Sequence, residues 1–341
     1  MSEQRFSNVV ISALEHIDAP VVVTSDEIDA QLEPVFDRLK FRPGLLESLA
    51  GVRERRFWEP GLTPADVSAM AGQKVLENSP VDREEIGVLI NTSVWREYVE
   101  PATASMVHNR LRLNRNALNF DVVNACLGFL NGMAIVSTMI ESGQINHGMV
   151  VDGEGSRDVI ERTIDRLLGP DATPASARDQ FATLTLGSGG AAVILSRADL
   201  VEEGHAFLGG VSRAATEHSE LCVASPDQMT TDVRGLLTSS LDIAKELWLA
   251  GQSGEYFNDD AVSLYAVHQV SEVHTRRVGD VLGVDQNKVP RIFPTFGNTG
   301  PSSIPMVLSK QVEAGNVKQG DRISLLGFGS GLNAAAYEVI W

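Results

Sequence analysis

The chain has 341 residues, of which 28 are basic and 45 acidic, and its formal net charge is −17. This balance argues against a nucleic-acid partner, because binding to phosphates needs a basic surface. Two cysteines are too few for a disulfide framework, the first residues lack a signal-peptide pattern and no apolar run approaches a membrane span, so we expect a cytoplasmic protein without an integral membrane segment.

The first part of the chain predicts a strand and two well-marked helix starts. Residues 6–13 have the pattern of a first strand, and an acidic helix start follows at Thr24. Thr63 and the proline after it predict a helix over 64–78. Between these elements, residues 53–58 (RERRFW) form a basic and aromatic cluster, which we expect to be a solvated loop. The alternative is a contact for the phosphate or adenine of a ligand.

An irregular segment separates a buried strand from the next helix. Residues 86–91 form the continuous apolar run of a strand buried on both faces, and residues 102–113 predict a helix. Between them, Glu100 comes directly before Pro101. The residue before proline is held away from the helical region, so we expect Glu100 on an extended loop. A glutamate in such a loop is most often solvated.

The centre of the chain joins a strand to a helix at Cys126. Residues 118–123 are β-branched and aromatic, as in a short buried strand, and residues 127–140 are apolar at helical spacing. Unpaired N–H groups at a helix start stabilise a thiolate and lower the pKa of the thiol. This stretch leaves two possibilities open, an activated nucleophile or a small buried apolar side chain.

Two further strands enclose a polar segment. Residues 148–153 predict a buried strand that ends in a glycine-rich turn with two acids, Asp152 and Glu154. Residues 156–182 are polar, with a helix-like start and a loop rich in proline, alanine and serine, so we interpret them as an insertion or cap. A glycine turn and another strand follow within 183–196.

The order of parts then repeats. A strand at 207–216 and an amphipathic helix at 232–250 precede the repeated elements. The paired segments are 86–91 with 261–268, the central helix with 299–314, 148–155 with 321–331, and 191–196 with 332–341. Strands alternating with helices in two similar halves, 1–200 and 201–341, predict an α/β fold with sheets covered on both faces.

Three features of the second half carry chemically useful groups. His268 ends a strand, Asn298 stands at the mouth of a helix, and residues 327–331 form a glycine turn with free N–H groups. Each has a structural alternative, namely a buried histidine, an N-cap and a tight turn. Together with Cys126 they supply a nucleophile, hydrogen-bond donors and oxyanion donors for acyl transfer.

Metal binding is not expected. His274 lies on a predicted helix after His268, and the two histidines are not expected to share a face for a metal. Neither cysteine has a metal-ligand neighbour at CxxC or HxxxH spacing.

Four motifs, taken together, resemble one family over nearly the whole chain. They are VVNACLGFLNG with Cys126, AVHQ with His268, FGNTGPSSIP with Asn298, and LLGFGSGLN near the C-terminus. Their order and spacing identify the chain as a member of the thiolase superfamily, in its ketoacyl synthase III-like branch. The resemblance implies a duplicated, five-layered α/β/α/β/α fold with two mixed sheets, and a homodimer. The chain reads HQVS where the branch often has HQAN, and Gly300-Pro301 after the asparagine, but neither change touches a proposed catalytic group.

The resemblance is closer to members of this branch that join two long-chain acyl-CoA molecules head to head for olefin biosynthesis. They carry a glutamate in an aromatic loop ahead of the nucleophile, and VWREYVEPATAS puts Glu100 there. The resemblance implies that Cys126 takes the first acyl group, that His268 and Asn298 hold the oxygen of the second thioester, and that N–H groups of Cys126 and Ser330 form the oxyanion hole. Glu100 is then the base that removes an α-proton, reaching into the partner subunit's site.

The resemblance also implies a 2-alkyl-3-oxo acid as product, no cofactor beyond the coenzyme A of the substrates, and possible downstream enzymes of an olefin pathway as partners. Three other interpretations compete with it. A decarboxylating 3-oxoacyl-ACP synthase III would use a malonyl thioester, a thioesterase would hydrolyse acyl-Cys126, and an acyl-CoA-binding scaffold is disfavoured because no motif is missing. Acyl chains need an apolar tunnel, for which residues 222–249 are either a wall or ordinary core.

Overall fold

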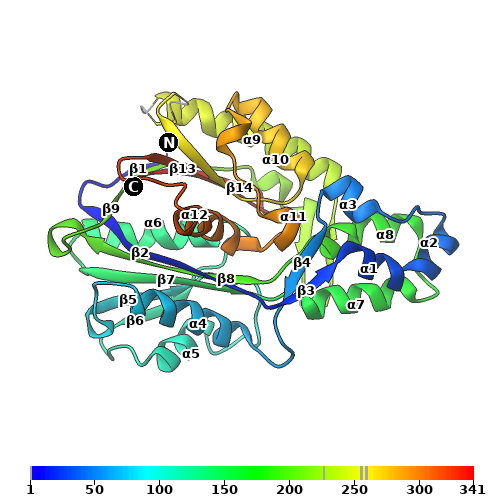
Figure 1. The fold of residues 1–341 in the computed structure, drawn as a ribbon, viewed down its shortest axis with the longest axis horizontal. Helices are drawn as coiled ribbons and strands as arrows, with labels where there is room; N and C mark the ends of the chain where they lie inside the picture. The colour runs from blue at the N-terminus through cyan, green and yellow to red at the C-terminus, as the bar shows by residue number, and fades with distance from the viewer. Residues whose placement is uncertain (1, 226, 254–255, 258–259) are drawn as a thin grey trace.

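Figure 1 shows the computed structural model of the chain, which describes residues 2–225, 227–253, 256–257 and 260–341. The strands of the first half are β1 Ser2–Arg5, β2 Val9–Asp18, β3 Val21–Thr24, β4 Glu54–Phe57, β5 Ile86–Asn91, β6 Leu118–Asp121, β7 His147–Glu154 and β8 Gly189–Arg197. Its helices are α1 Ser25–Gln31, α2 Glu33–Leu39, α3 Leu45–Ala50, α4 Pro64–Glu77, α5 Thr103–Leu111, α6 Gly128–Glu141, α7 Arg157–Leu168 and α8 Pro174–Gln180.

The second half repeats much of this order. Its strands are β9 His205–Ala214, β10 Cys222–Ala224, β11 Met229–Thr231, β12 Val262–Val267, β13 Arg322–Gly329 and β14 Asn333–Ile340. Its helices are α9 Val233–Ser253, α10 Glu272–Leu282, α11 Phe293–Phe296 and α12 Ser303–Glu313.

The same sheet topology occurs twice. The strands β5, β7, β8 and β2 lie side by side in that order, and β12, β13, β14 and β9 repeat it. In both sets the first pair is parallel and the next two pairs are antiparallel. The strands pair as the repeated segments of the sequence predict, so the duplication is confirmed, and each copy is a mixed half-sheet.

The two half-sheets are arranged in five layers. In Figure 1, α6 and α12 lie between them, α4 and α5 cover the outer face of one, and α9 and α10 cover the outer face of the other. A short pairing of β2 with β9, through Val10 with Ala206 and Ile11 with His205, connects the half-sheets into one ten-stranded sheet of the described residues. The predicted α/β/α/β/α arrangement is therefore confirmed, whereas the division at residue 200 stays a prediction.

The two central helices are largely buried. Leu130, Met133 and Val136 of α6 and Ile304 and Val307 of α12 are buried in the largest apolar cluster, between the half-sheets. Burying one such side chain contributes about 1.5–3 kcal/mol, so this cluster holds both helix starts firmly in place. The predicted catalytic residues lie close to those starts.

A smaller lobe lies at one end of the layers. It contains α1, α2, α3, α7, α8 and the β3–β4 hairpin, which share an apolar cluster of their own (Figure 1). Helix α1 begins where the sequence predicted a helix start, and there Thr24 and Glu27 bond reciprocally as a cap. The segment interpreted as an insertion, 156–182, forms α7 and α8 of this lobe.

The basic cluster at 53–58 was predicted to be a solvated loop, and this prediction is wrong. Residues 54–57 form β4, in which alternate side chains point inward, and the Arg55 side chain is 0% exposed. Its guanidinium donates to the carbonyl groups of Val23 and Leu184 and to the Ser25 hydroxyl, at 3.1–3.3 Å. Burial lowers the pKa of Arg55 to about 10, so it stays charged at neutral pH and crosslinks the lobe.

Two other features differ from the sequence-based expectations. The strand leading to Cys126 is at the sheet edge, with Leu118 exposed, because no further strand among the described residues covers it. Asp152 and Glu154 lie within β7 and are buried, although the sequence placed them in a turn. Within the described residues, no helix is both long and apolar enough to cross a membrane.

Candidate active site

Cys126 lies in a tight turn two residues before α6. The N–H groups of Leu127 and Gly128 bond to the carbonyl oxygens of Asn124 and Ala125 at 3.0 and 3.2 Å. Ala125 has a φ of 44°, a left-handed conformation that costs a non-glycine residue about 1–3 kcal/mol and is found mainly at functional sites. The turn leaves Cys126 half-buried at the helix start, where the sequence predicted it.

The C-terminal glycine turn packs against this cysteine turn. A Cβ atom on Gly329 would lie 2.9 Å from the carbonyl oxygen of Asn124 and 3.1 Å from Cβ of Leu127, so a larger residue would push the two segments apart. Asn333 adds a hydrogen bond from its Nδ2 to Oδ1 of Asn124 at 3.3 Å. Ser330 follows Gly329 directly and is therefore brought beside the Cys126 turn.

His268 and Asn298 are in contact. Nε2 of His268 lies 3.3 Å from Oδ1 of Asn298, and the N–H of Gly300 donates to the same oxygen at 3.0 Å. These contacts orient the amide so that its NH2 group is left to act as a donor. Burial lowers the pKa of His268 to about 3, with a smaller contribution from His274, so the imidazole is neutral at physiological pH.

Gln269 explains why these two residues meet. Its side chain accepts hydrogen bonds from the N–H groups of Ile292 and Phe293 and donates to the carbonyl oxygen of Pro290 at 2.5 Å. This clamp holds the segment that leads to Asn298 against the end of β12. The sequence named Gln269 only as part of a motif, and nothing local indicated this long-range role.

The backbone of Asn298 is held on its other side by the first half of the chain. Its N–H donates to Thr185 at 2.9 Å and its carbonyl oxygen accepts from Gly187 at 2.8 Å. A Cβ on Gly187 would lie 1.7 Å from the carbonyl oxygen of Phe296, so glycine is required for this approach. The histidine and asparagine are thus fixed on rigid backbone.

Two buried acids that the sequence did not assign to the site connect its two halves. Asp152 accepts hydrogen bonds from Thr92 at 2.6 Å and from Ser302 at 2.5 Å. Glu154 accepts from the N–H of Val94 at 2.6 Å, and a Cβ on Gly300 would lie 3.6 Å from its carboxyl carbon. The acids therefore tie the start of the Glu100 loop to the turn after Asn298.

The pKa of the Cys126 thiol is shifted in the direction opposite to the one expected from the sequence. The helix start was expected to lower the pKa of the thiol, but burial raises it, and nearby Glu154, Cys222 and Asp152 add to the increase. The resting thiol is therefore neutral, and its proton must leave during acylation. Within the expected tunnel region, 222–249, Ile243 and Leu247 are ordinary core, and the role of this region as a tunnel wall stays a prediction.

The state of Asp152 predicts a pH-dependent stability. Burial raises its pKa from 3.8 to about 7, so folding favours the protonated form. This contribution is complete below about pH 4 and is lost as pH rises through 7. We expect the free energy of unfolding of wild type, measured with denaturant, to fall between pH 4.5 and 8 by on the order of 3 kcal/mol more than that of Asp152→Asn. Asp179→Asn, which changes an exposed acid, is the control. If the free energy of unfolding depended on pH equally in Asp152→Asn and wild type, the raised pKa of Asp152 would be contradicted.

Glu100 is not part of this cluster within one chain. It lies exposed on the loop 92–102, and no hydrogen bond or ion pair among the described residues joins it to Cys126, His268 or Asn298. The loop is held at both ends, by Glu154 at Val94 and by Asp121, which accepts from the N–H groups of Thr103 and Ala104 at 3.0 and 2.8 Å.

Comparisons with known proteins show the family of the chain. Family models of 3-oxoacyl-[acyl-carrier-protein] synthase III match residues 120–214, and those of its C-terminal part match residues 255–341. An acyl-CoA:acyl-CoA alkyltransferase of Xanthomonas campestris pv. campestris is 43% identical over 98% of this chain and 99% of its own. One of Shewanella oneidensis is 33% identical over 99% of this chain and 100% of its own.

Solved structures extend the likeness to the fold. Cerulenin-bound OleA of Xanthomonas campestris superposes with a TM-score of 0.97 at 43% identity, covering 99% of this chain and 98% of that one. A cysteine-to-serine variant of the same protein, solved with lauric acid and lauroyl-CoA bound, also gives 0.97, over 98% of this chain and 100% of that one. The chain therefore belongs to the thiolase superfamily, in its ketoacyl synthase III-like branch, as an acyltransferase of the acyl-CoA:acyl-CoA alkyltransferase family.

Proposed function

We propose that the protein condenses two long-chain acyl-CoA molecules without decarboxylation and releases a 2-alkyl-3-oxo acid. The observation that carries this proposal is Glu100, a carboxylate on an exposed loop whose two ends are anchored beside the site. A synthase that makes its carbanion by losing carbon dioxide needs only donors, whereas condensation of two plain thioesters needs a base for the α-proton.

Related structures support the same residues. Crystal structures of the Xanthomonas protein include single substitutions of a cysteine, a glutamate and a histidine. The spacing of those three positions along that chain equals the spacing of Cys126, Glu100 and His268 here. The bound lauroyl-CoA in that protein supports a long-chain acyl thioester as substrate class.

In the first step, the Cys126 sulfur attacks the thioester carbonyl of one acyl-CoA. The bond between carbon and the CoA sulfur breaks, and the departing thiolate takes up the thiol proton, giving free CoA and acyl-Cys126. The N–H groups of Cys126 and Ser330 stabilise the oxyanion of the tetrahedral intermediate.

In the second step, Glu100 takes the α-proton of the second acyl-CoA while His268 Nε2 and Asn298 Nδ2 donate to its thioester oxygen. The resulting enolate attacks the acyl-Cys126 carbonyl, a carbon–carbon bond forms, and the cysteine leaves as thiolate, which recovers a proton from Glu100. Water then hydrolyses the remaining CoA thioester. The reaction consumes no co-substrate besides water. The acid product is the substrate of olefin-forming enzymes in the cytoplasm.

A homodimer is part of this proposal. Exposed apolar side chains lie on the Glu100 loop and around the edge strand β6. Those of the loop are Val94, Tyr98 and Val99, and those at the strand are Leu118 and Val123. Val99 is 97% exposed, which is unfavourable unless another surface covers it. An edge strand with open N–H and carbonyl groups favours pairing with a second copy, which would carry Glu100 toward the partner's cysteine.

Incubation with a long-chain acyl-CoA as the sole substrate tests the reaction. We expect an intact-mass increase of one acyl group on the protein, and a 3-oxo acid or the ketone formed by its decarboxylation. Condensation that appears only after addition of a malonyl thioester would instead favour a decarboxylating 3-oxoacyl-ACP synthase III. Free fatty acid as the sole product would favour a thioesterase.

A further inference from the structure

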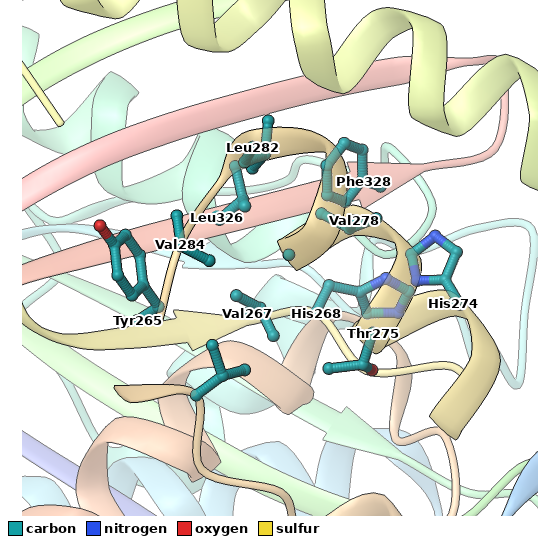
Figure 2. A pocket seen from close by; sticks show the side chains of 12 residues that line it. Tyr265, Val267, His268, His274, Thr275, Val278, Leu282, Val284, Leu326 and Phe328 are labelled. Carbon is teal, nitrogen blue, oxygen red and sulfur yellow. The ribbon is translucent and has the colours of Figure 1, made fainter. Parts of the chain in front are cut away.

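A small cavity lies behind the proposed catalytic histidine. Figure 2 shows that it is enclosed mainly by apolar side chains such as Val278, Leu326 and Phe328, and that His268, His274 and Thr275 also line it. The cavity offers about 10 Å³ to the centre of a water molecule, which is room for one. The two histidines, not expected from the sequence to share a face, thus meet at one cavity.

Three buried polar atoms at this cavity have no hydrogen-bond partner among the described residues. They are Nδ1 of His268, Nδ1 of His274 and Oγ1 of Thr275. The three residues are only 4%, 9% and 3% exposed. A buried polar group without a partner is costly, and native proteins commonly satisfy such groups with an internal water that makes about three hydrogen bonds.

The tautomer of His268 follows from its other contact. Nε2 faces Oδ1 of Asn298, an oxygen that can only accept, so Nε2 must carry the hydrogen. The neutral ring then presents a lone pair at Nδ1 and needs a donor there. The Thr275 hydroxyl and a water molecule are the donors that this cavity can provide.

We propose that one water molecule, held by Thr275 and His274, donates a hydrogen bond to Nδ1 of His268 and so keeps the ring proton on Nε2. The Thr275 hydroxyl donates to this water, which in turn donates to the two Nδ1 atoms. This inference rests on the proposed function, because a proton on Nε2 is what His268 needs to hold the oxygen of the second thioester. Thr275 and His274 are positioning residues, and neither touches the substrate.

The first test reads the tautomer directly. The full-length protein with ¹⁵N-labelled histidine is studied by NMR, and the His268 signals are assigned by their loss in His268→Asn. We expect a protonated Nε2 and a hydrogen-bonded, unprotonated Nδ1 in wild type. In Thr275→Val, Nδ1 should lose the shift caused by its hydrogen bond or gain the proton. A protonated Nδ1 in wild type would overturn the inference, whatever the activity.

The second test separates the steps of the reaction. Thr275→Val and His274→Phe should lower kcat for condensation about fivefold, with an unchanged KM and an unchanged rate of Cys126 acylation. Thr275→Ser should restore kcat because it returns the hydroxyl. Ser324→Ala removes another buried hydroxyl without a partner, away from the cavity, and should leave the kinetics unchanged.

The outcomes separate the two proposals. Normal condensation by His268→Ala would refute the role of His268 in the proposed function. Loss of condensation in His268→Ala, together with unchanged kcat and unchanged Nδ1 signals in both Thr275→Val and His274→Phe, would refute only the water-mediated positioning. Circular dichroism and thermal unfolding verify that each variant is folded.

Discussion

Cys126→Ala is expected to abolish both the acyl adduct and carbon–carbon bond formation, lowering the condensation rate by at least about 1,000-fold. The side chain is the only thiol in the turn between β6 and α6, and alanine fits the same half-buried position, so the fold should be retained. Intact-mass measurement after incubation with a long-chain acyl-CoA reads the adduct, and product analysis reads the condensation.

Cys222→Ala is the matched control. Cys222 is the second free thiol of the chain and lies close enough to influence the pKa of Cys126. This variant should still form the adduct and the product. An adduct that persists in Cys126→Ala and disappears in Cys222→Ala would show that the nucleophile had been misassigned.

The pKa of the thiol adds a pH signature to this experiment. Because burial and Glu154 raise the pKa of Cys126, the resting enzyme holds a thiol and little thiolate at neutral pH. Alkylation of Cys126 by iodoacetamide in the Cys222→Ala variant should therefore become steadily faster up to at least about pH 9. A rate that levels off near neutral pH would mean that the helix start lowers the pKa of Cys126 by more than burial raises it.

The parts of the fold that local chemistry determines could be predicted from the sequence. The caps at Thr24 and Thr63, each closed by an acid three residues on, are set by neighbouring residues. Strand β5 is apolar up to its last residue, Asn91, because it is covered on both faces, and the repeated order of elements reflects the duplicated topology. The places of Cys126 and His268, at a helix start and a strand end, follow from the same local patterns.

The features that the sequence did not reveal depend on contacts between distant segments. Arg55 is buried because the carbonyl groups of Val23 and Leu184 and the hydroxyl of Ser25 surround its guanidinium, which a local charge pattern cannot show. Asp152 and Glu154 appear as ordinary turn acids until Thr92, Ser302 and Val94 are seen around them. The sign of the Cys126 pKa shift was missed for the same reason, since burial depends on the whole fold.

Glu100→Ala is expected to separate acylation from condensation. The variant should form the Cys126 adduct at the wild-type rate, because the exposed Glu100 does not contact the nucleophile within its own chain. Condensation should fall by about 100- to 10,000-fold, the usual contribution of a general base. Glu97→Ala changes another glutamate of the same loop and serves as the control for the loop itself. Normal condensation by Glu100→Ala would refute the assignment of the base.

Mixing two inactive variants decides whether Glu100 acts across the subunit interface. When Cys126→Ala and Glu100→Ala subunits are exchanged, a mixed dimer contains one cysteine and one glutamate on different chains. If Glu100 serves the partner's cysteine, one site of each mixed dimer is complete, and random exchange should restore about a quarter of wild-type activity. If Glu100 serves the cysteine of its own chain, no site is complete and activity stays at background. Because the single chain leaves Glu100 exposed beside an apolar edge and away from Cys126, His268 and Asn298, we expect restoration.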